Sequence, residues 1–125
     1  MGTCCETFVE EATMRASEVA RFMRAFGDGT RLRIILLLAR SPFSVAALAQ
    51  SLRCPLKRIS RHLQYLAARG VVGSHGERGH PVYHLCSPGD PLHRGALAAL
   101  AAVRDRVVET GPDQSRAARL TAGGV

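Results

Sequence analysis

The chain has 125 residues, 46% of them hydrophobic and 22% charged, which is enough for one globular domain with a buried core. Its longest strongly apolar run, Leu32 to Ala39, is far shorter than the roughly 20 residues that span a bilayer, and Glu6, Glu10 and Glu11 fall where a signal peptide would be apolar. These features argue against a membrane or secreted protein, and we expect a cytoplasmic location without a membrane partner.

The charge of the chain favours a polyanionic partner. Seventeen Lys and Arg residues against ten Asp and Glu residues give a formal net charge of +7. A positive surface field of that kind attracts nucleic acid. Aromatic residues make up only 5% of the chain and Trp is absent, so the stacking platforms on which single-strand binders depend are lacking. Charge alone does not separate DNA from RNA or an acidic membrane, but duplex binding fits this composition better than single-strand binding does.

Two helices are predicted in the first third of the chain. The segment from Thr7 to Arg24 opens with the spacing of a capping box and places apolar residues near one helical face. After a glycine-containing break at 27–29, Thr30 is placed to cap a second helix. That helix, Leu32 to Leu38, has almost no polar face, so we expect it to form the buried centre of the domain.

The next two helices have the spacing of a helix-turn-helix. Ser44 is placed to cap a short helix, Val45 to Leu52, and the three residues 53–55 separate it from a fourth helix of about Leu56 to Arg69. Gly70 follows as a left-handed residue that ends the fourth helix. In such a motif the second helix enters the major groove while the first braces it against the backbone.

A β-hairpin and a fifth helix are predicted to follow. Val71–Val72 and Val82–Leu85 read as two short strands joined by a glycine-containing loop, which is typical of a wing. The stretch Leu92 to Val108 is rich in Ala and Leu and predicts a helix suited to helix association. Residues 111–125 lack periodicity and are predicted to be a disordered tail.

The predicted fold class is thus mainly α with a small β-wing. It is a winged helix-turn-helix of five helices and a two-stranded antiparallel hairpin, with a DNA-binding and dimerisation domain at 1–110 and the tail at 111–125.

The fourth helix carries the candidate DNA-reading residues. At about 100° per residue, an apolar stripe of Leu56, Ile59, Leu63 and Leu66 lies opposite a polar, largely basic stripe. For an isolated stripe a solvated helix face is the alternative, but its place in a helix-turn-helix favours contact with base edges and phosphates. The predicted DNA-binding residues are Lys57, Arg58, Ser60, Arg61, His62 and Gln64 on this helix, with His75 and Arg78 in the wing.

Two segments resemble a known family. Residues 26–34, Phe-Gly-Asp-Gly-Thr-Arg-Leu-Arg-Ile, are similar to a signature of the ArsR/SmtB family of metal-responsive repressors, and Ser60-Arg61-His62-Leu63 resembles the recognition helix of that family. The resemblance covers roughly Val19 to Leu85. It implies a homodimer built on the first and fifth helices, a palindromic operator, and release of DNA when an inducer binds.

The chain departs from the family pattern at several positions. Pro55 stands where a capping Ser is frequent, Arg61 stands where a His is common, and residues 77–79 read Glu-Arg-Gly in place of Glu-Gly-Arg. The resemblance therefore does not imply an operator sequence.

The four cysteines are candidate inducer ligands: Cys4, Cys5, Cys54 and Cys86. Cys4 and Cys5 are adjacent thiols near the N-terminus, and soft thiophilic ions prefer such ligands. Cys54 lies where the family places a buried Leu, so a small core residue is its default role, and metal binding there is the alternative. Cys86 follows the second wing strand, near the dimer interface that the resemblance implies, and the same two roles are open to it.

Two metal-binding motifs of the family are absent from this chain, which reduces the number of candidate inducers. The family's arsenic and cadmium motif has no counterpart at 40–45, and the zinc pattern of the fifth helix is missing because Asp90 and His93 are spaced differently. We therefore expect a thiolate site for Hg(II), in preference to As(III), with Cd(II) or Pb(II) as further candidates.

Other functions remain open at this point. The same fold could carry a thiol-redox or persulfide switch, which needs two cysteines within disulfide distance. A sequence-neutral architectural protein is a third reading. A thiol enzyme is disfavoured because no nucleophile motif accompanies the cysteines, so no enzymatic activity and no small organic substrate are expected.

Overall fold

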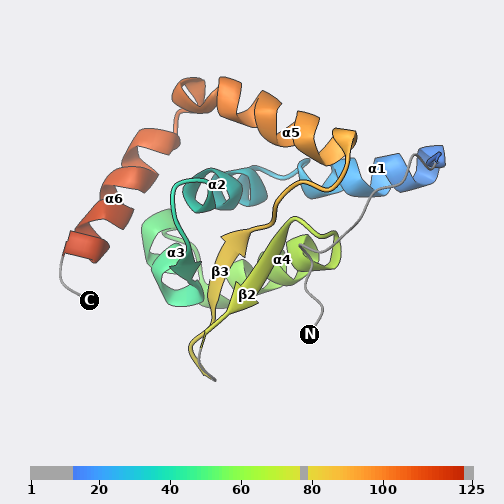
Figure 1. Ribbon diagram of the computed structural model, residues 1–125. Coiled ribbons are helices and arrows are strands. Elements are labelled where there is room, and N and C mark those ends of the chain that lie inside the picture. Colours follow the sequence, from blue (N-terminus) through green and yellow to red (C-terminus); the bar gives the residue numbers. More distant parts are fainter. Residues whose placement is uncertain (1–12, 77–78, 123–125) are drawn as a thin grey trace.

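The computed structural model describes residues 13–76 and 79–122, which form six α-helices and a three-stranded sheet. Figure 1 shows α5 crossing above α1 and α2, α6 beside α3, and two strands projecting away from the helices. The elements in chain order are α1 (Ala16–Ala25), α2 (Gly29–Leu38), β1 (Phe43–Ser44), α3 (Val45–Leu52), α4 (Leu56–Ala68), β2 (Val72–His75), β3 (Val82–Leu85), α5 (Pro91–Ala102), the 3-10 helix η2 (Arg104–Arg106) and α6 (Thr110–Ala122).

The second helix is the centre of the domain, as its sequence predicts. Residues 34–38 are each at most 4% exposed, and Ile34, Ile35, Leu37 and Leu38 belong to the hydrophobic core cluster. The predicted cap is wrong by two residues, because the carboxylate of Asp28, and not Thr30, accepts a hydrogen bond from the backbone N–H of Arg31 at 3.1 Å. Asp is as good an N-cap as Thr, and here it also starts the helix at Gly29.

The first helix is shorter than predicted. Residues 13–15 are not helical, and α1 begins at Ala16, where Glu18 accepts a hydrogen bond from the backbone N–H of Arg15 at 2.9 Å. The capping-box spacing at Thr7 lies outside the described residues. From Ala16 onward Phe22 and Phe26 of the predicted apolar face pack against the core beside the fully buried Ala25. Met23, which was predicted on the same face, is 53% exposed instead.

The helix-turn-helix forms with the predicted bounds. The hydroxyl of Ser44 accepts a hydrogen bond from the N–H of Ala47 at 3.1 Å, and Arg53 makes the turn in the left-handed region, with φ of 56°. On α4, Ile59, Leu63 and Leu66 are fully buried. The predicted left-handed Gly70, with φ of 76°, follows the helix.

One member of the predicted apolar stripe does not reach the core. Leu56 is 55% exposed, because it stands at the first position of α4, where the helix has only just left the turn. It lines an open hollow of about 350 Å³ with the start of α3 and the wing residues Gly79 and His80. Periodicity alone places Leu56 on the buried stripe, but it cannot show where the core ends.

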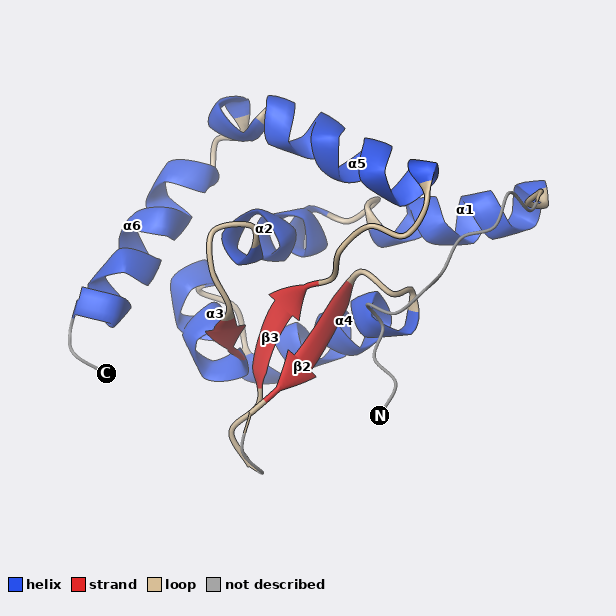
Figure 2. Cartoon of the chain, viewed as in Figure 1, coloured by secondary structure: helices blue, strands red, loops and turns tan. Residues whose placement is uncertain are grey.

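The wing is part of a sheet with one strand more than predicted. Figure 2 shows β1 beside β3, and the strand order is β1-β3-β2, all antiparallel. Phe43 pairs with Tyr83, while Val72 pairs with Leu85 on the other side of β3. A two-residue strand has no measurable alternation, so β1 left no signal in the sequence.

The C-terminal region is helical where a disordered tail was predicted. The fifth helix ends at Ala102 instead of Val108, and residues 110–122 form α6, which packs against α3 and α2. The anchor is Asp113, whose side chain is 3% exposed. Its carboxylate accepts two hydrogen bonds from Arg33, each 2.9 Å, and one from Arg116 at 2.8 Å.

Contacts with the preceding helices explain why α6 is ordered despite its weak apolar pattern. Arg33 also donates to the carbonyl of Leu52 at 3.0 Å, and Arg116 donates to that of Ser51 at 2.6 Å. Both carbonyls belong to the last turn of α3, where they lack partners within the helix. The disordered-tail prediction is therefore wrong for the described part of this segment.

None of the helices within residues 13–76 and 79–122 is long and apolar enough to cross a membrane.

The substitution Asp113→Ala tests this anchor. We expect it to lower the free energy of unfolding by about 3 kcal/mol, at the lower end for breaking a buried ion pair because both guanidinium groups keep some contact with solvent. Urea unfolding at neutral pH measures the loss. The control is Asp105→Ala, an exposed carboxylate in η2, for which we expect a change within about 0.5 kcal/mol. Equal losses in the two variants would contradict the anchoring role.

Candidate nucleic-acid interface

The outward face of α4 is cationic. Lys57, Arg58 and Arg61 are exposed, as is Gln64, and Ser60 is half-buried beside the hollow at the base of the wing. Among the described residues three salt bridges form, and none of them involves a cation of this face. These side chains are therefore not neutralised by the carboxylates of the described part of the chain, and they can reach phosphates or base edges.

His62 turns away from this face. Its side chain is 18% exposed, its Nε2 lies 3.8 Å from a carboxylate oxygen of Asp28, and its Nδ1 lies 3.2 Å from Nη1 of Arg31. Because a guanidinium can only donate, Nδ1 is the acceptor and the proton of the neutral ring sits on Nε2, facing Asp28. In this structure the ring ties α4 to the start of α2.

Arg31 connects three helices at this point. Its Nε donates to the carbonyl of Ala25 at 3.1 Å and its Nη2 to that of Arg24 at 2.8 Å, so it satisfies two carbonyls in the last turn of α1. Its guanidinium also lies 4.2 Å from the ring centre of Tyr65 on α4. Together with the contact to His62, these interactions connect α4 to α1 and α2.

The surroundings shift the pKa values of two of these groups. Burial lowers the pKa of His62, the charge of Asp28 opposes this, and Arg31, Arg61 and Arg58 lower it further. Burial by itself would raise the pKa of Asp28, but the N–H of Arg31 and the positive charges of His62 and Arg31 bring it below its usual value. The cationic face of α4 thus disfavours a proton on His62.

In the wing, two histidines lie against each other. His75 on β2 and His84 on β3 have their Nδ1 atoms 3.1 Å apart and their ring centres 5.0 Å apart. His75 is exposed and His84 is half-buried. Arg78, the predicted wing contact, lies outside the described residues, so its role stays a prediction.

Comparisons with known proteins agree with this geometry. Residues 26–74 match a helix-turn-helix domain family. The homodimeric winged helix-turn-helix DNA-binding domain of Mb0332 from Mycobacterium bovis, described as a possible ArsR-family transcriptional regulator, is 30% identical, with a TM-score of 0.60 over 74% of this chain and 83% of that one. The chain belongs to the ArsR family of winged-helix transcriptional regulators.

Two further solved structures share the fold of this ArsR-family chain. Reduced HlyU from Vibrio cholerae is 22% identical, with a TM-score of 0.61 over 74% of this chain and 92% of that one. The transcriptional repressor BigR from Xylella fastidiosa is 24% identical, with a TM-score of 0.60 over 74% and 89% of the two chains. Among curated proteins no sequence matches the chain.

Of the four candidate cysteines, the structure describes two. Cys54, in the turn before α4, is half-buried, packs against the core and has a free thiol, which agrees with its default role as a small core residue. Cys86 is 2% exposed and disulfide-bonded, and its backbone N–H donates to the carbonyl of Val71 at 3.0 Å. Cys4 and Cys5 lie outside the described residues.

The described residues do not by themselves fit a metal ion. Within them no group of three or more His, Cys, Asp or Glu side chains is close enough to hold one. Cys86 is already engaged in a disulfide, and a disulfide sulfur is not a thiolate ligand. A thiophilic metal site that includes Cys86 would therefore require this disulfide to be reduced first.

Sequence reasoning missed Arg31 and Arg33, the two residues that hold α4 and α6 in place. The sequence does contain a feature that could have indicated them: both arginines lie near the start of an apolar helix, where the helix dipole disfavours positive charge. A cation there indicates a specific partner, but the sequence does not show which one.

The lowered pKa of His62 predicts a pH dependence of stability. In the unfolded chain the imidazole of His62 has its ordinary pKa of about 6.5. In the folded protein its pKa is lower, so the folded state takes up this proton only at a lower pH. The free energy of unfolding is therefore expected to fall as pH drops from about 7.5 to about 5. His62→Gln keeps an acceptor for Arg31 and should make this fall in stability smaller. Part of the fall should persist in the variant, because burial also lowers the pKa of His93.

Urea unfolding at several pH values measures this effect. His80→Gln, at an exposed wing position, is the matched control and should keep the wild-type pH dependence. If His62→Gln kept the wild-type slope as well, the assigned environment of His62 would be wrong.

Proposed function

We propose that this ArsR-family regulator is a repressor that binds duplex operator DNA as a homodimer, through α4 and the wing, and releases it when its cysteines react. The observation that carries the proposal is the cationic face of α4. Lys57, Arg58 and Arg61 stand on the second helix of a helix-turn-helix and form no ion pair with the described carboxylates. Such a face gains binding free energy from phosphates through the release of counterions.

The surface formed by α1 and α5 supports the homodimer. The two helices meet where the rings of Phe22 and His93 lie 5.4 Å apart, and Figure 1 shows them together on the side away from the wing. Met23 in α1 and Val103 at the end of α5 are 53% and 42% exposed. Large exposed apolar side chains on paired helices favour burial against a second copy, which would set two copies of α4 on one duplex.

Arg61→Ala tests the DNA-binding face. We expect it to weaken binding to a duplex from the chain's own promoter region by about tenfold or more, because a base-contacting arginine supplies about 1–3 kcal/mol of discrimination. If Arg61 contacts phosphate instead, the salt slope of the affinity should fall by about two per dimer. Fluorescence anisotropy across salt concentrations separates these results.

The control is Arg106→Ala, which removes an exposed arginine of η2 and should leave affinity and slope unchanged. Wild-type affinity in Arg61→Ala would contradict the assigned face. Equal binding of the wild-type protein to a random duplex at physiological salt would favour an architectural protein over a repressor.

For the inducer, the disulfide at Cys86 favours oxidation as a second candidate beside metal binding. Two thiols give up two protons and two electrons, and hydrogen peroxide takes them to form two water molecules. Cys86 follows β3 directly and leads into α5, so a cross-link there constrains the connection between the wing and the proposed dimer helix. A change in the redox state of Cys86 would in this way change DNA affinity, and we propose that the reduced form binds DNA more tightly.

Cys86→Ser should keep DNA binding and lose release by peroxide, while Cys54→Ser, the matched control, should keep both. A Cys4→Ser, Cys5→Ser double variant should lose release by Hg(II) if these thiols hold the metal. Anisotropy of a bound operator, challenged in turn with peroxide, Hg(II), As(III), Cd(II) and Pb(II), reads out both inducers. Release of Cys86→Ser by peroxide would exclude the oxidative switch, and release of the double variant by Hg(II) would exclude the metal site.

A further inference from the structure

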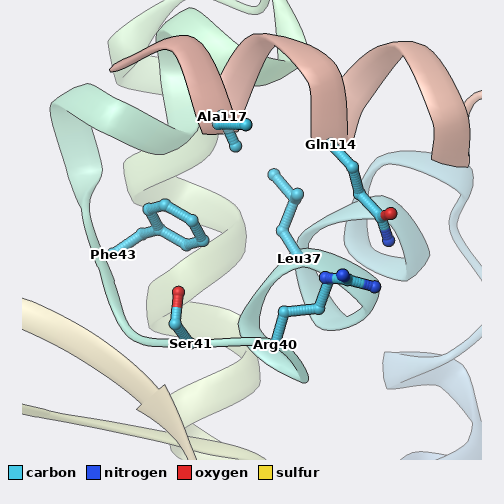
Figure 3. A pocket seen from close by; sticks show the side chains of 7 residues that line it. Leu37, Arg40, Ser41, Phe43, Gln114 and Ala117 are labelled. Atoms are coloured by element: carbon cyan, nitrogen blue, oxygen red, sulfur yellow. The ribbon is translucent and has the colours of Figure 1, made fainter. Parts of the chain in front are cut away.

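We infer that the pocket between α2, β1 and α6 is a second effector site, one that binds a small organic carboxylate with an apolar body. The pocket has a volume of about 380 Å³, within the usual range for small-molecule sites. Figure 3 shows the side chains of three separate segments facing this space. The lining residues are Leu37, Arg40, Ser41, Phe43, Gln114, Ala117 and Ala118.

The walls of this pocket suit an apolar body. Leu37 and Ala117 belong to the buried core, at 2% and 4% exposed, and the ring of Phe43 packs against the same core from β1. A hydrocarbon or aryl group placed here would leave water without displacing a buried polar side chain.

The polar groups of the pocket are mainly donors. Arg40 forms no ion pair with a described carboxylate, and Ser41 adds a hydroxyl. Gln114 also lines the pocket, and its Nε2 has no hydrogen-bond partner among the described residues but is itself shielded from solvent, so Arg40 and Ser41 are the donors that a ligand meets first. Figure 3 shows the side chains of Arg40 and Gln114 extending toward each other across the pocket. Since none of the described residues that line the pocket is Asp or Glu, the complementary ligand group is an anionic oxygen acceptor such as a carboxylate.

The pocket lies at the junction of the DNA-binding elements. Phe43 pairs with Tyr83 of the wing strand β3, and the next strand residue, Ser44, caps α3. On the opposite wall, α6 is joined to the end of α3 through Arg116 and Arg33. A ligand between these walls would bear on the placement of α3 relative to the wing, independently of the cysteines.

Octanoate, kept below its critical micelle concentration, is the probe. Isothermal titration calorimetry compares it with octan-1-ol, which has the same tail without the charge, and with octylamine, which has the opposite charge. We expect octanoate to bind at least about tenfold more tightly than either. Arg40→Gln should weaken octanoate binding by about tenfold or more, whereas Arg106→Gln, at an exposed position outside the pocket, should leave it unchanged.

Ala118→Phe fills the pocket from its exposed rim and should abolish octanoate binding while the far-ultraviolet circular dichroism stays native. Lack of octanoate binding to the wild-type protein, equal binding of octan-1-ol, or unchanged binding by Arg40→Gln or Ala118→Phe would each overturn the inference. The titration contains no DNA, so its result is independent of whether the repressor assignment holds.

Discussion

The guanidinium group of Arg31 joins α4 to the two helices that precede it in the core of the domain. Arg31 donates to two carbonyls at the end of α1, lies over Tyr65 and contacts His62 on α4. A guanidinium is suited to this position because its donors are rigidly arranged and it is always charged. The cationic face of α4 can serve DNA only if the opposite side of the helix is held firmly, and three fully buried side chains plus this contact provide that support.

The same helix carries a second arginine that performs the equivalent task on the other side of the domain. Arg33 reaches Asp113 of α6 and the carbonyl of Leu52 at the end of α3. Two cations near the start of α2 are unfavourable to the helix dipole, and each is compensated by carbonyls at the end of a neighbouring helix. Through these two arginines, the N-terminal part of α2 binds the C-terminal ends of α1 and α3.

The sequence predicted the elements that depend on interactions between residues close together in the chain, and it failed for those that depend on residues far apart. The helix-turn-helix was predictable because Ile59, Leu63 and Leu66 repeat at helical spacing and Ser44 caps its own helix, both local effects. The helix α6 was not, since its order rests on Asp113 meeting an arginine 80 residues away in the chain. At the candidate site the exposed cations were predictable from the same periodicity, but the inward turn of His62 was not, because it depends on Asp28 and Arg31.

The two proposed effector sites act on one strand from its two ends. The carboxylate pocket touches β3 through the pairing of Phe43 with Tyr83, and Cys86 follows β3 at Leu85. A small ligand changes DNA affinity only to the extent that it binds the DNA-bound and free forms differently, and about 1.4 kcal/mol of difference is needed for a tenfold change. Since β3 is the strand to which both neighbours of the sheet are bonded, strain applied at either end reaches the whole wing. Ligand binding in the pocket and oxidation at Cys86 should therefore affect each other as well as DNA binding. Once one of them has displaced β3, the other needs less free energy to displace it further.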